Sequence, residues 1–253
     1  MAARVDTYDV LGVKISAVNL AKAEAVIAGM VARRAKGYVC VAPVATIMDC
    51  QDDPDYRRVI NAADLVTPDG VPIAWLGRCA GHSLVARTYG PDLMERLCDH
   101  GRALGWKHFF YGATPEICDK LEARLKAKFP GLNVVGKMSP PFMPKAVRIS
   151  SDETGCINAA GADIVWVGLG APKQDIWCDL NRSGLEAPVL IGIGAAFDFL
   201  SGMKVQAPRW VQRCGLEWLF RLCCEPRRLW RRYLIGNARF IGLLFNQRIR
   251  KSA

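Results

Sequence analysis

The stretch ADIVWVGLGAPKQDIWCDLN (residues 162–181) indicates how this chain folds. Residues 164–167 are continuously apolar, two glycines follow at Gly168 and Gly170, and a helical pattern begins near Pro172. A strand without polar alternation is typical of a parallel sheet that is buried on both faces, and helices join such strands. This stretch therefore predicts a strand–loop–helix unit of an α/β fold.

The same unit recurs along most of the chain. We expect strands at 37–42, 64–70, 106–112, 131–136 and within 188–200. We expect helices at 21–35, 53–63, 91–104, 114–129 and 172–181, and a further helix that ends at about residue 160. The alternation predicts a Rossmann-like parallel sheet covered by helices, with a small hairpin in residues 7–19. We assign residues 1–203 to one α/β catalytic domain and 204–253 to a basic helical appendage.

Charge is distributed very unevenly over the 253 residues. The net charge is +10, and residues 204–253 hold twelve Lys/Arg against two Glu, so the rest of the chain is neutral. A cationic segment of this kind indicates an anionic partner, such as nucleic acid, phosphates or an acidic membrane surface. No apolar stretch is long enough to span a bilayer and none resembles a secretory signal. The ten cysteines show no metal-ligand spacing, which favours a reducing cytoplasm.

Polar residues follow several predicted strands, where α/β sheets bind ligands. Asp69 lies in a TPDG turn after one strand and is a candidate general base, although an Asx-turn is about as probable from sequence alone. Gly112 and Thr114 precede a helix whose amino end could bind a phosphate. Asp198 follows the Gly-rich segment at 192–194 and is either a ribose ligand or a helix cap.

The loop at 168–174 adds three further candidates. Gly170 frees the backbone, Lys173 could meet a phosphate and Gln174 could bind sugar hydroxyls. A dinucleotide fingerprint would need glycine where Lys173 stands, which argues against a nicotinamide-dependent oxidoreductase.

A literal D-x-D motif occurs at Asp53-Pro54-Asp55. Metal-dependent sugar transferases use such a motif, but here it coincides with the start of a predicted helix, where acidic groups offset the helix dipole. We therefore expect no metal site and no cofactor.

Taken together, the segments of this chain resemble the WecG/TagA/CpsF glycosyltransferases (glycosyltransferase family 26). The resemblance extends from about residue 38 to 240 in family order. Its segments are DPDYRRVINAADLVTPDGVPIAW, RTYGPDLM, FFYGATPE with KFPGLNVVG, VGLGAPKQDIW, IGIGAAFDFLSG and QAPRWVQRCGLEWLFRLCCEPRRLWRRYL.

This resemblance implies inverting, metal-independent transfer of a hexose or N-acetylhexosamine from a UDP-sugar to a polyprenyl-diphosphate-linked acceptor, for cell-surface polysaccharide or exopolysaccharide synthesis. It implies that Asp69 is the catalytic base. Residues implied in substrate binding are Arg87 and Gln174 at the sugar and diphosphate, Asp198 and the Gly112–Thr114 loop at the nucleotide, and Arg209, Arg221 and Arg228 over the diphosphate. Pro43 stands where the family commonly has Asn, so the donor sugar is the least secure implication.

Residues 227–250 form an amphipathic pattern when placed on a regular helix, with arginines on one side and aromatic and aliphatic residues on the other. Such a helix can lie in a membrane interface. We expect membrane contact through Arg231, Arg232, Arg239, Trp230, Phe240 and Leu244. The structural alternative is that the apolar side packs on the α/β body, and a mixed arrangement would dock 208–225 and leave 227–249 for lipid.

Three rival interpretations remain open on the sequence alone. A nucleic-acid-binding protein would use the basic tail, an oxidoreductase would use the α/β body, and a non-catalytic lipid-tethered scaffold would use both but would not explain the placement of Asp69, Arg87 and Gln174. We favour a peripheral enzyme on the cytoplasmic face of the bacterial plasma membrane, with no nucleic-acid partner. Exposed apolar surface would favour self-association into a homo-oligomer.

Overall fold

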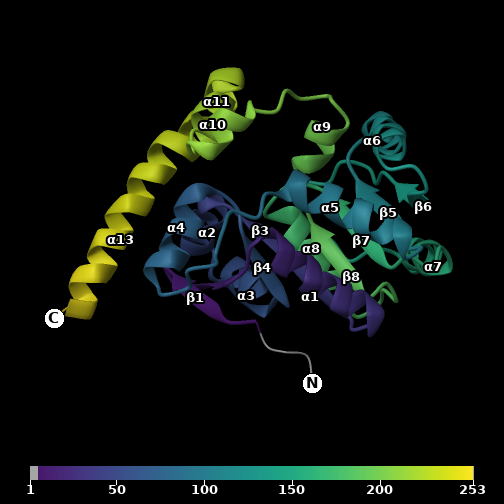
Figure 1. Ribbon diagram of the computed structural model, residues 1–253, viewed down its shortest axis with the longest axis horizontal. Helices are drawn as coiled ribbons and strands as arrows, with labels where there is room; N and C mark the ends of the chain where they lie inside the picture. The colour runs from purple at the N-terminus through teal and green to yellow at the C-terminus, as the bar shows by residue number, and fades with distance from the viewer. Residues whose placement is uncertain (1–4, 253) are drawn as a thin grey trace.

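A computed structural model of the protein describes residues 5–252 (Figure 1). Within this range the main sheet has six parallel strands in the order β4-β3-β8-β7-β5-β6. The strands are β3 (Gly37–Ala42), β4 (Leu65–Pro68), β5 (Lys107–Gly112), β6 (Asn133–Met138), β7 (Ile164–Gly168) and β8 (Val189–Gly192). The predicted parallel α/β sheet is therefore confirmed.

Helices cover both faces of this sheet, and each face has its own buried apolar cluster. One face carries α1 (Leu20–Ala32), α5 (Gly90–Ala103), α6 (Pro115–Lys128) and α9 (Ala196–Leu200). The other carries α2 (Val44–Asp52), α3 (Pro54–Ala62), α4 (Val71–Cys79), α7 (Ser151–Ala159) and α8 (Lys173–Asn181). Two-sided burial explains why the strands lack polar alternation.

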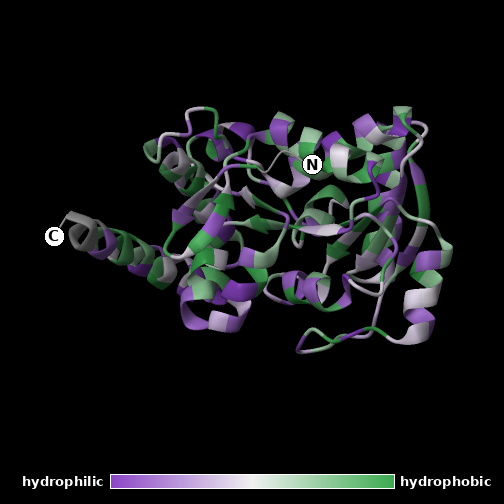
Figure 2. Ribbon diagram, turned by 90° about the horizontal axis from the view of Figure 1, so that it is seen from below, coloured by the Kyte–Doolittle hydropathy of each residue, from purple (hydrophilic) through white to green (hydrophobic). Residues whose placement is uncertain are grey.

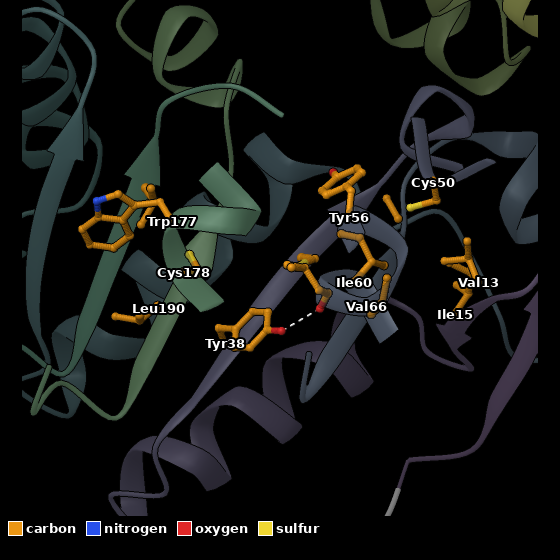
Figure 3. Close-up of a cluster of buried hydrophobic side chains, with 14 of the residues drawn as sticks. Val13, Ile15, Tyr38, Cys50, Tyr56, Ile60, Val66, Trp177, Cys178 and Leu190 are labelled. Atoms are coloured by element: carbon orange, nitrogen blue, oxygen red, sulfur yellow. Dashed lines mark hydrogen bonds between the residues drawn. The ribbon is translucent and has the colours of Figure 1, made fainter. Parts of the chain in front are cut away.

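The cluster on the second face contains several large polar-tipped side chains (Figure 3). Tyr38 is buried among Ile60, Cys178 and Leu190, and its hydroxyl donates a 2.6 Å hydrogen bond to the carbonyl oxygen of Val59. The bond satisfies the hydroxyl, so the ring can be buried without leaving a polar atom unpaired.

The predicted N-terminal hairpin is present as β1 (Thr7–Val10) and β2 (Val13–Ser16). Its two turn residues, Leu11 and Gly12, have φ values of 54° and 83°. Positive φ at both positions is the requirement of a type I′ turn, which glycine meets without strain. The buried residues Val10, Val13 and Ile15 join the cluster under α3 and α4.

The D-x-D motif forms a helix start. The side chain of Asp53 accepts hydrogen bonds of 3.0 Å from the backbone N–H groups of Asp55 and Tyr56, and Pro54 occupies the first turn of α3. Asp53 is thus an N-cap residue, in agreement with the structural interpretation of the motif.

The chain beyond Lys204 is helical, as predicted, over the range that the structure describes. It contains α10 (Arg209–Arg213), α11 (Glu217–Cys224), α12 (Pro226–Trp230), a π-helical segment at Arg231–Ile235 and α13 (Gly236–Ser252). In Figure 1, α10 and α11 lie above α4 and to the left of α9, and α13 runs down the left side of the α/β body. Figure 2 shows the C-terminal part of α13 projecting from the body. None of the helices in residues 5–252 has the length and apolarity that crossing a bilayer requires.

Candidate active site

A cavity of about 930 Å³ lies beyond the carboxyl ends of the strands. The parallel sheet brings several of the predicted strand-end residues to its wall, and the appendage contributes the opposite wall. Predicted site residues that line it are Asp69, Arg87, Thr114, Gly170, Lys173, Gln174, Asp198, Arg221 and Arg228. The cavity therefore brings together most of the residues that the sequence singled out.

Asp69 directly follows β4 at one end of this cavity. Its backbone N–H donates a 3.2 Å hydrogen bond to the carbonyl oxygen of Ala42, the last residue of β3. Because Ala42 is also in register with Pro68, the following residues Pro43 and Asp69 lie at neighbouring strand ends. Gly70 turns the chain away with a φ of 95°, a conformation that favours glycine.

The Asp69 carboxylate is shielded from solvent, with 19% of its side-chain surface exposed. The Nε of Arg87 is 3.6 Å from its Oδ1. Burial raises the pKa of Asp69 to about 6, against the lowering effect of Arg87, and the nearby carboxylate of Glu217 raises it further. An Asp with this pKa can accept a proton near neutral pH more readily than an exposed carboxylate can.

We predict that kcat/KM falls as the pH drops below about 6, because a base must be ionised and Asp69 becomes protonated there. Below that value each pH unit should lower kcat/KM about tenfold. A pH–rate profile from pH 4.5 to 9 checks this prediction. An acid limb centred near pH 4, as for an exposed carboxylate, would contradict it.

The loop after β5 contributes Thr114, whose side chain accepts a 3.3 Å hydrogen bond from the N–H of Ile117 and caps α6. Gly112 does not line the cavity. Its φ is 107°, and a Cβ there would lie 2.7 Å from the carbonyl oxygen of Gly168. Gly112 thus permits close approach of the β5 and β7 ends, and direct ligand contact through it is not supported by its placement.

The loop after β7 presents Gln174 and Lys173 to the cavity. Gln174 is 3% exposed, and its Oε1 has no hydrogen-bond partner. Gly194 leaves room for this amide, because a Cβ there would lie 2.8 Å from Oε1. Lys173 donates from Nζ to the carbonyl oxygen of Met143 at 3.1 Å. An unpaired acceptor at the wall of a cavity is suited to a ligand hydroxyl or N–H group.

Positive charge gathers on the appendage side of the cavity. Its lining contains Lys204, Arg221, Arg228 and Arg232. Lys204 pairs with Asp198 at 3.0 Å, so Asp198 holds a cation at the wall. Arg209 does not line the cavity and instead pairs with Asp92 at 2.9 Å, which ties α10 to α5. The role predicted for Arg209 at the diphosphate is therefore not supported by its position.

Two residues predicted to contact the membrane pack on the protein instead. Phe240 is 4% exposed and belongs to the core cluster, and Leu244 is half-buried against it. These two assignments need correction, because α13 packs against α2. Arg232 is exposed and lines the cavity, so its contact with the membrane stays a prediction. Arg231 and Trp230 are exposed, while Arg239 pairs with Asp52 of α2 at 2.6 Å.

The structure adds two residues that the sequence analysis missed. Gln212 and Glu217 of the appendage line the cavity and contact Arg87. The sequence carries no signal for them, since their partner is 125 and 130 residues away along the chain.

Among residues 5–252, no group of three or more His, Cys, Asp or Glu side chains is placed to hold a metal ion. Metal independence of the reaction stays a prediction.

A cavity of this kind, beyond the carboxyl ends of a parallel sheet and lined by one shielded carboxylate and several cations, suits an α/β group-transfer enzyme that acts on anionic substrates. Sequence comparison makes the class specific, because residues 8–253 match the Glycosyl transferase WecG/TagA/CpsF family. The chain belongs to this family of glycosyltransferases.

One named relative is similar over most of the chain. It is the N-acetylglucosaminyldiphosphoundecaprenol N-acetyl-beta-D-mannosaminyltransferase of Bacillus spizizenii. The two sequences are 32% identical over 186 residues, which cover 74% of this chain and 70% of the relative.

Proposed function

We propose that this glycosyltransferase moves an N-acetylhexosamine from a UDP-sugar to a sugar linked to polyprenyl diphosphate, with inversion and without a metal ion. One observation carries the proposal: the shielded Asp69 carboxylate and a group of appendage cations line the same cavity. A base for the acceptor and fixed positive charge for a departing diphosphate are the two groups that this reaction requires.

In the proposed reaction the acceptor hydroxyl gives its proton to Asp69 as its oxygen bonds to the anomeric carbon of the donor. The bond from that carbon to the diphosphate oxygen breaks, and UDP leaves with the electron pair. Lys204, Arg221 and Arg228 would offset the charge that develops on UDP. A single displacement of this kind inverts the anomeric centre.

The strand order supports a donor that lies along the edge of the sheet, from Asp69 toward the loop after β7. Asp69 follows β4, and Gly170 and Gln174 follow β7, three strand positions away. Neighbouring strands are about 4.8 Å apart, so the two places are separated by about 14 Å along the sheet edge. An extended nucleotide-sugar can bridge such a distance, with its sugar beside Asp69 and its nucleotide toward Thr114 and Asp198.

The sugar specificity is proposed from the relative. The name of that relative specifies transfer of N-acetylmannosamine to N-acetylglucosaminyl-diphosphoundecaprenol, and we propose substrates of the same class here. Pro43 lies beside Asp69 and offers no side-chain hydrogen bond. We propose that any polar contact to the sugar at this corner comes from another residue.

An acceptor of this kind is embedded in a membrane, so we further propose that the enzyme works at the cytoplasmic face of the bacterial plasma membrane. The appendage exposes Trp210 and Leu234, which are 66% and 51% exposed, next to its arginines. Exposed apolar side chains beside basic ones favour binding at an anionic lipid interface.

The function is tested by a transfer assay with a panel of UDP-hexoses and UDP-N-acetylhexosamines and a short-chain N-acetylglucosaminyl-diphosphopolyprenol. We expect product from a UDP-N-acetylhexosamine, with inverted anomeric configuration by NMR, and an unchanged rate in excess EDTA. Failure of every UDP-sugar would refute the donor class, and strong inhibition by EDTA would refute metal independence.

A further inference from the structure

The guanidinium of Arg87 is held by groups from both parts of the chain. Its Nε lies 3.6 Å from Asp69, and its guanidinium carbon is 4.0 Å from the centre of the Tyr89 ring. From the appendage, Gln212 accepts a 3.1 Å hydrogen bond from Nη1, and Glu217 accepts one from Nη2. The appendage therefore supplies both hydrogen-bond acceptors of the two terminal nitrogens.

These appendage contacts are well defined. The Arg87 and Glu217 side chains are only 17% and 16% exposed. Gln212 is buried, and its Nε2 donates a 2.7 Å hydrogen bond to the carbonyl oxygen of Ala207, which leaves its Oε1 for Arg87. Shielding from solvent makes such charge-assisted contacts stronger than exposed ones.

The arrangement has a consequence for Asp69. A guanidinium next to a carboxylate tends to form two parallel hydrogen bonds with it, which occupy both oxygens and stabilise the ionised form. Here Glu217 and Gln212 hold the terminal nitrogens, and Asp69 keeps only the 3.6 Å approach to Nε, beyond hydrogen-bond distance. The oxygens of Asp69 stay available for another donor.

We propose that Glu217 is a positioning residue that holds Arg87 away from a bidentate pair with Asp69 and so keeps that carboxylate free to take the acceptor proton. The inference rests on the proposed function, in which Asp69 is the base. Because Glu217 lies on α11, the pair Asp69–Arg87 reaches this geometry only when the appendage is docked on the body.

Four charged groups act on Asp69 from the surrounding elements. Arg87 and Arg221 lower its pKa, while Glu217 of α11 and Asp92 of α5 raise it. Removal of the Glu217 charge takes away one raising influence and frees Arg87 to pair with Asp69. Both changes favour the ionised carboxylate, so the pKa of Asp69 should fall and the base should become weaker.

The test is the variant Glu217→Gln in the full chain. The Asp69 carboxyl is titrated by ¹³C NMR, with its signal assigned by comparison with Asp69→Asn, and kcat/KM is measured over the same pH range. We expect the Asp69 midpoint to fall by about one pH unit or more. We also expect the acid limb of kcat/KM to move down with it, and kcat/KM at neutral pH to drop about tenfold.

Glu116→Gln is the charge-matched control, because Glu116 is an exposed residue of α6 that pairs with Lys120. It should leave the midpoint and kcat/KM unchanged. If Glu217→Gln does not fold, Gln212→Leu removes the other appendage contact and should lower the midpoint by a smaller amount. An unchanged or raised midpoint in the folded variant, or an equal shift in Glu116→Gln, overturns the proposal.

The NMR titration does not depend on turnover. If the midpoint falls in Glu217→Gln but the wild-type protein transfers no sugar, the positioning of Arg87 is supported and the proposed transferase reaction is what fails. If sugar is transferred but the midpoint does not move, the reaction stands and the role of Glu217 fails.

Discussion

Replacement of Asp69 by asparagine is expected to lower kcat by about 10²–10⁴-fold, because the acceptor hydroxyl loses its base. Asparagine has the same shape, and Arg87 keeps its contacts with Gln212 and Glu217. The affinity for UDP, measured by calorimetry, should therefore change little. Single-turnover rates in saturating donor and acceptor check the effect on the chemical step.

The same variant should be more stable than the wild-type protein at neutral pH. The folded pKa of Asp69, about 6, lies above the 3.8 of an ordinary Asp, so the folded state binds the proton more tightly than the unfolded state does. Folding stability is thus lost as the pH rises from about 4 to about 6 and stays lower above that range. Asparagine removes this cost, which is on the order of 3 kcal/mol, and should raise Tm by several degrees.

Asp99→Asn provides the control, since Asp99 is an exposed carboxylate paired with Arg102. It should leave both turnover and Tm within error of the wild type. An active Asp69→Asn enzyme would remove Asp69 as the base. An inactive but less stable one would mean that burial does not raise the pKa of this carboxyl.

Much of the fold and of the candidate site could be predicted, because both depend on residues that are close together in the sequence. Unbroken apolar strands followed by capped helices predicted the parallel sheet, and parallel strands bring their carboxyl ends to one edge. Asp69 could be placed at the site because it directly follows β4, and Gln174 because it lies in the first turn of the helix that follows β7. The helix starts at Asp53 and Thr114 were recognisable for the same reason, since cap chemistry involves neighbours in sequence.

Three helices of the α/β body were not predicted, and the shortest of them is α9, which lies in the segment 188–200 that was expected to hold a strand. Helix α2 begins one residue after β3, and its β-branched residues Val44, Thr46 and Ile47 continue the apolar character of the strand. Short apolar segments of this kind cannot be assigned by periodicity alone. Helix α4 follows Gly70 and contains Pro72, which indicated a turn.

The apolar side of the tail was expected to face lipid as one surface, but the structure divides it. Leu229 and Phe240 are 2% and 4% exposed and face the core, while Trp230, Ile241 and Phe245 are 42%, 54% and 64% exposed. An amphipathic pattern shows which side of a helix is apolar, but not how much of that side another element covers.

The exposed part of this side leaves a narrower apolar surface for lipid. Leu234, Ile241 and Phe245 are 51%, 54% and 64% exposed. Their spacing of seven and four residues places them near one line along the helix. Arg231 is exposed in the preceding turn, with its guanidinium carbon 5.2 Å from the centre of the Trp230 ring. We name Leu234, Ile241 and Phe245 the outer stripe.

Substitution of all three residues of the outer stripe by glutamate should nearly abolish binding to anionic vesicles. Each half-exposed side chain still has about 1 kcal/mol of apolar transfer free energy to gain on insertion. Loss of all three gives about 3 kcal/mol, or roughly a hundredfold weaker binding, before the added negative charge is counted. Sedimentation with phosphatidylcholine vesicles containing phosphatidylglycerol measures the change.

The control is Leu84→Glu, because Leu84 is 79% exposed on the α/β body and lies outside the appendage. It should bind vesicles as the wild type does and keep the wild-type UDP affinity, since Leu84 does not line the cavity. Ile241 does line it, so the UDP affinity of the triple variant is measured alongside to separate loss of lipid contact from damage to the cavity. Vesicle binding by the triple variant at wild-type strength would mean that the outer stripe does not contact lipid. A wild-type protein that prefers duplex DNA to vesicles would point instead to nucleic acid as the anionic partner, because DNA binding depends on the arginines and gains little from exposed leucine, isoleucine and phenylalanine.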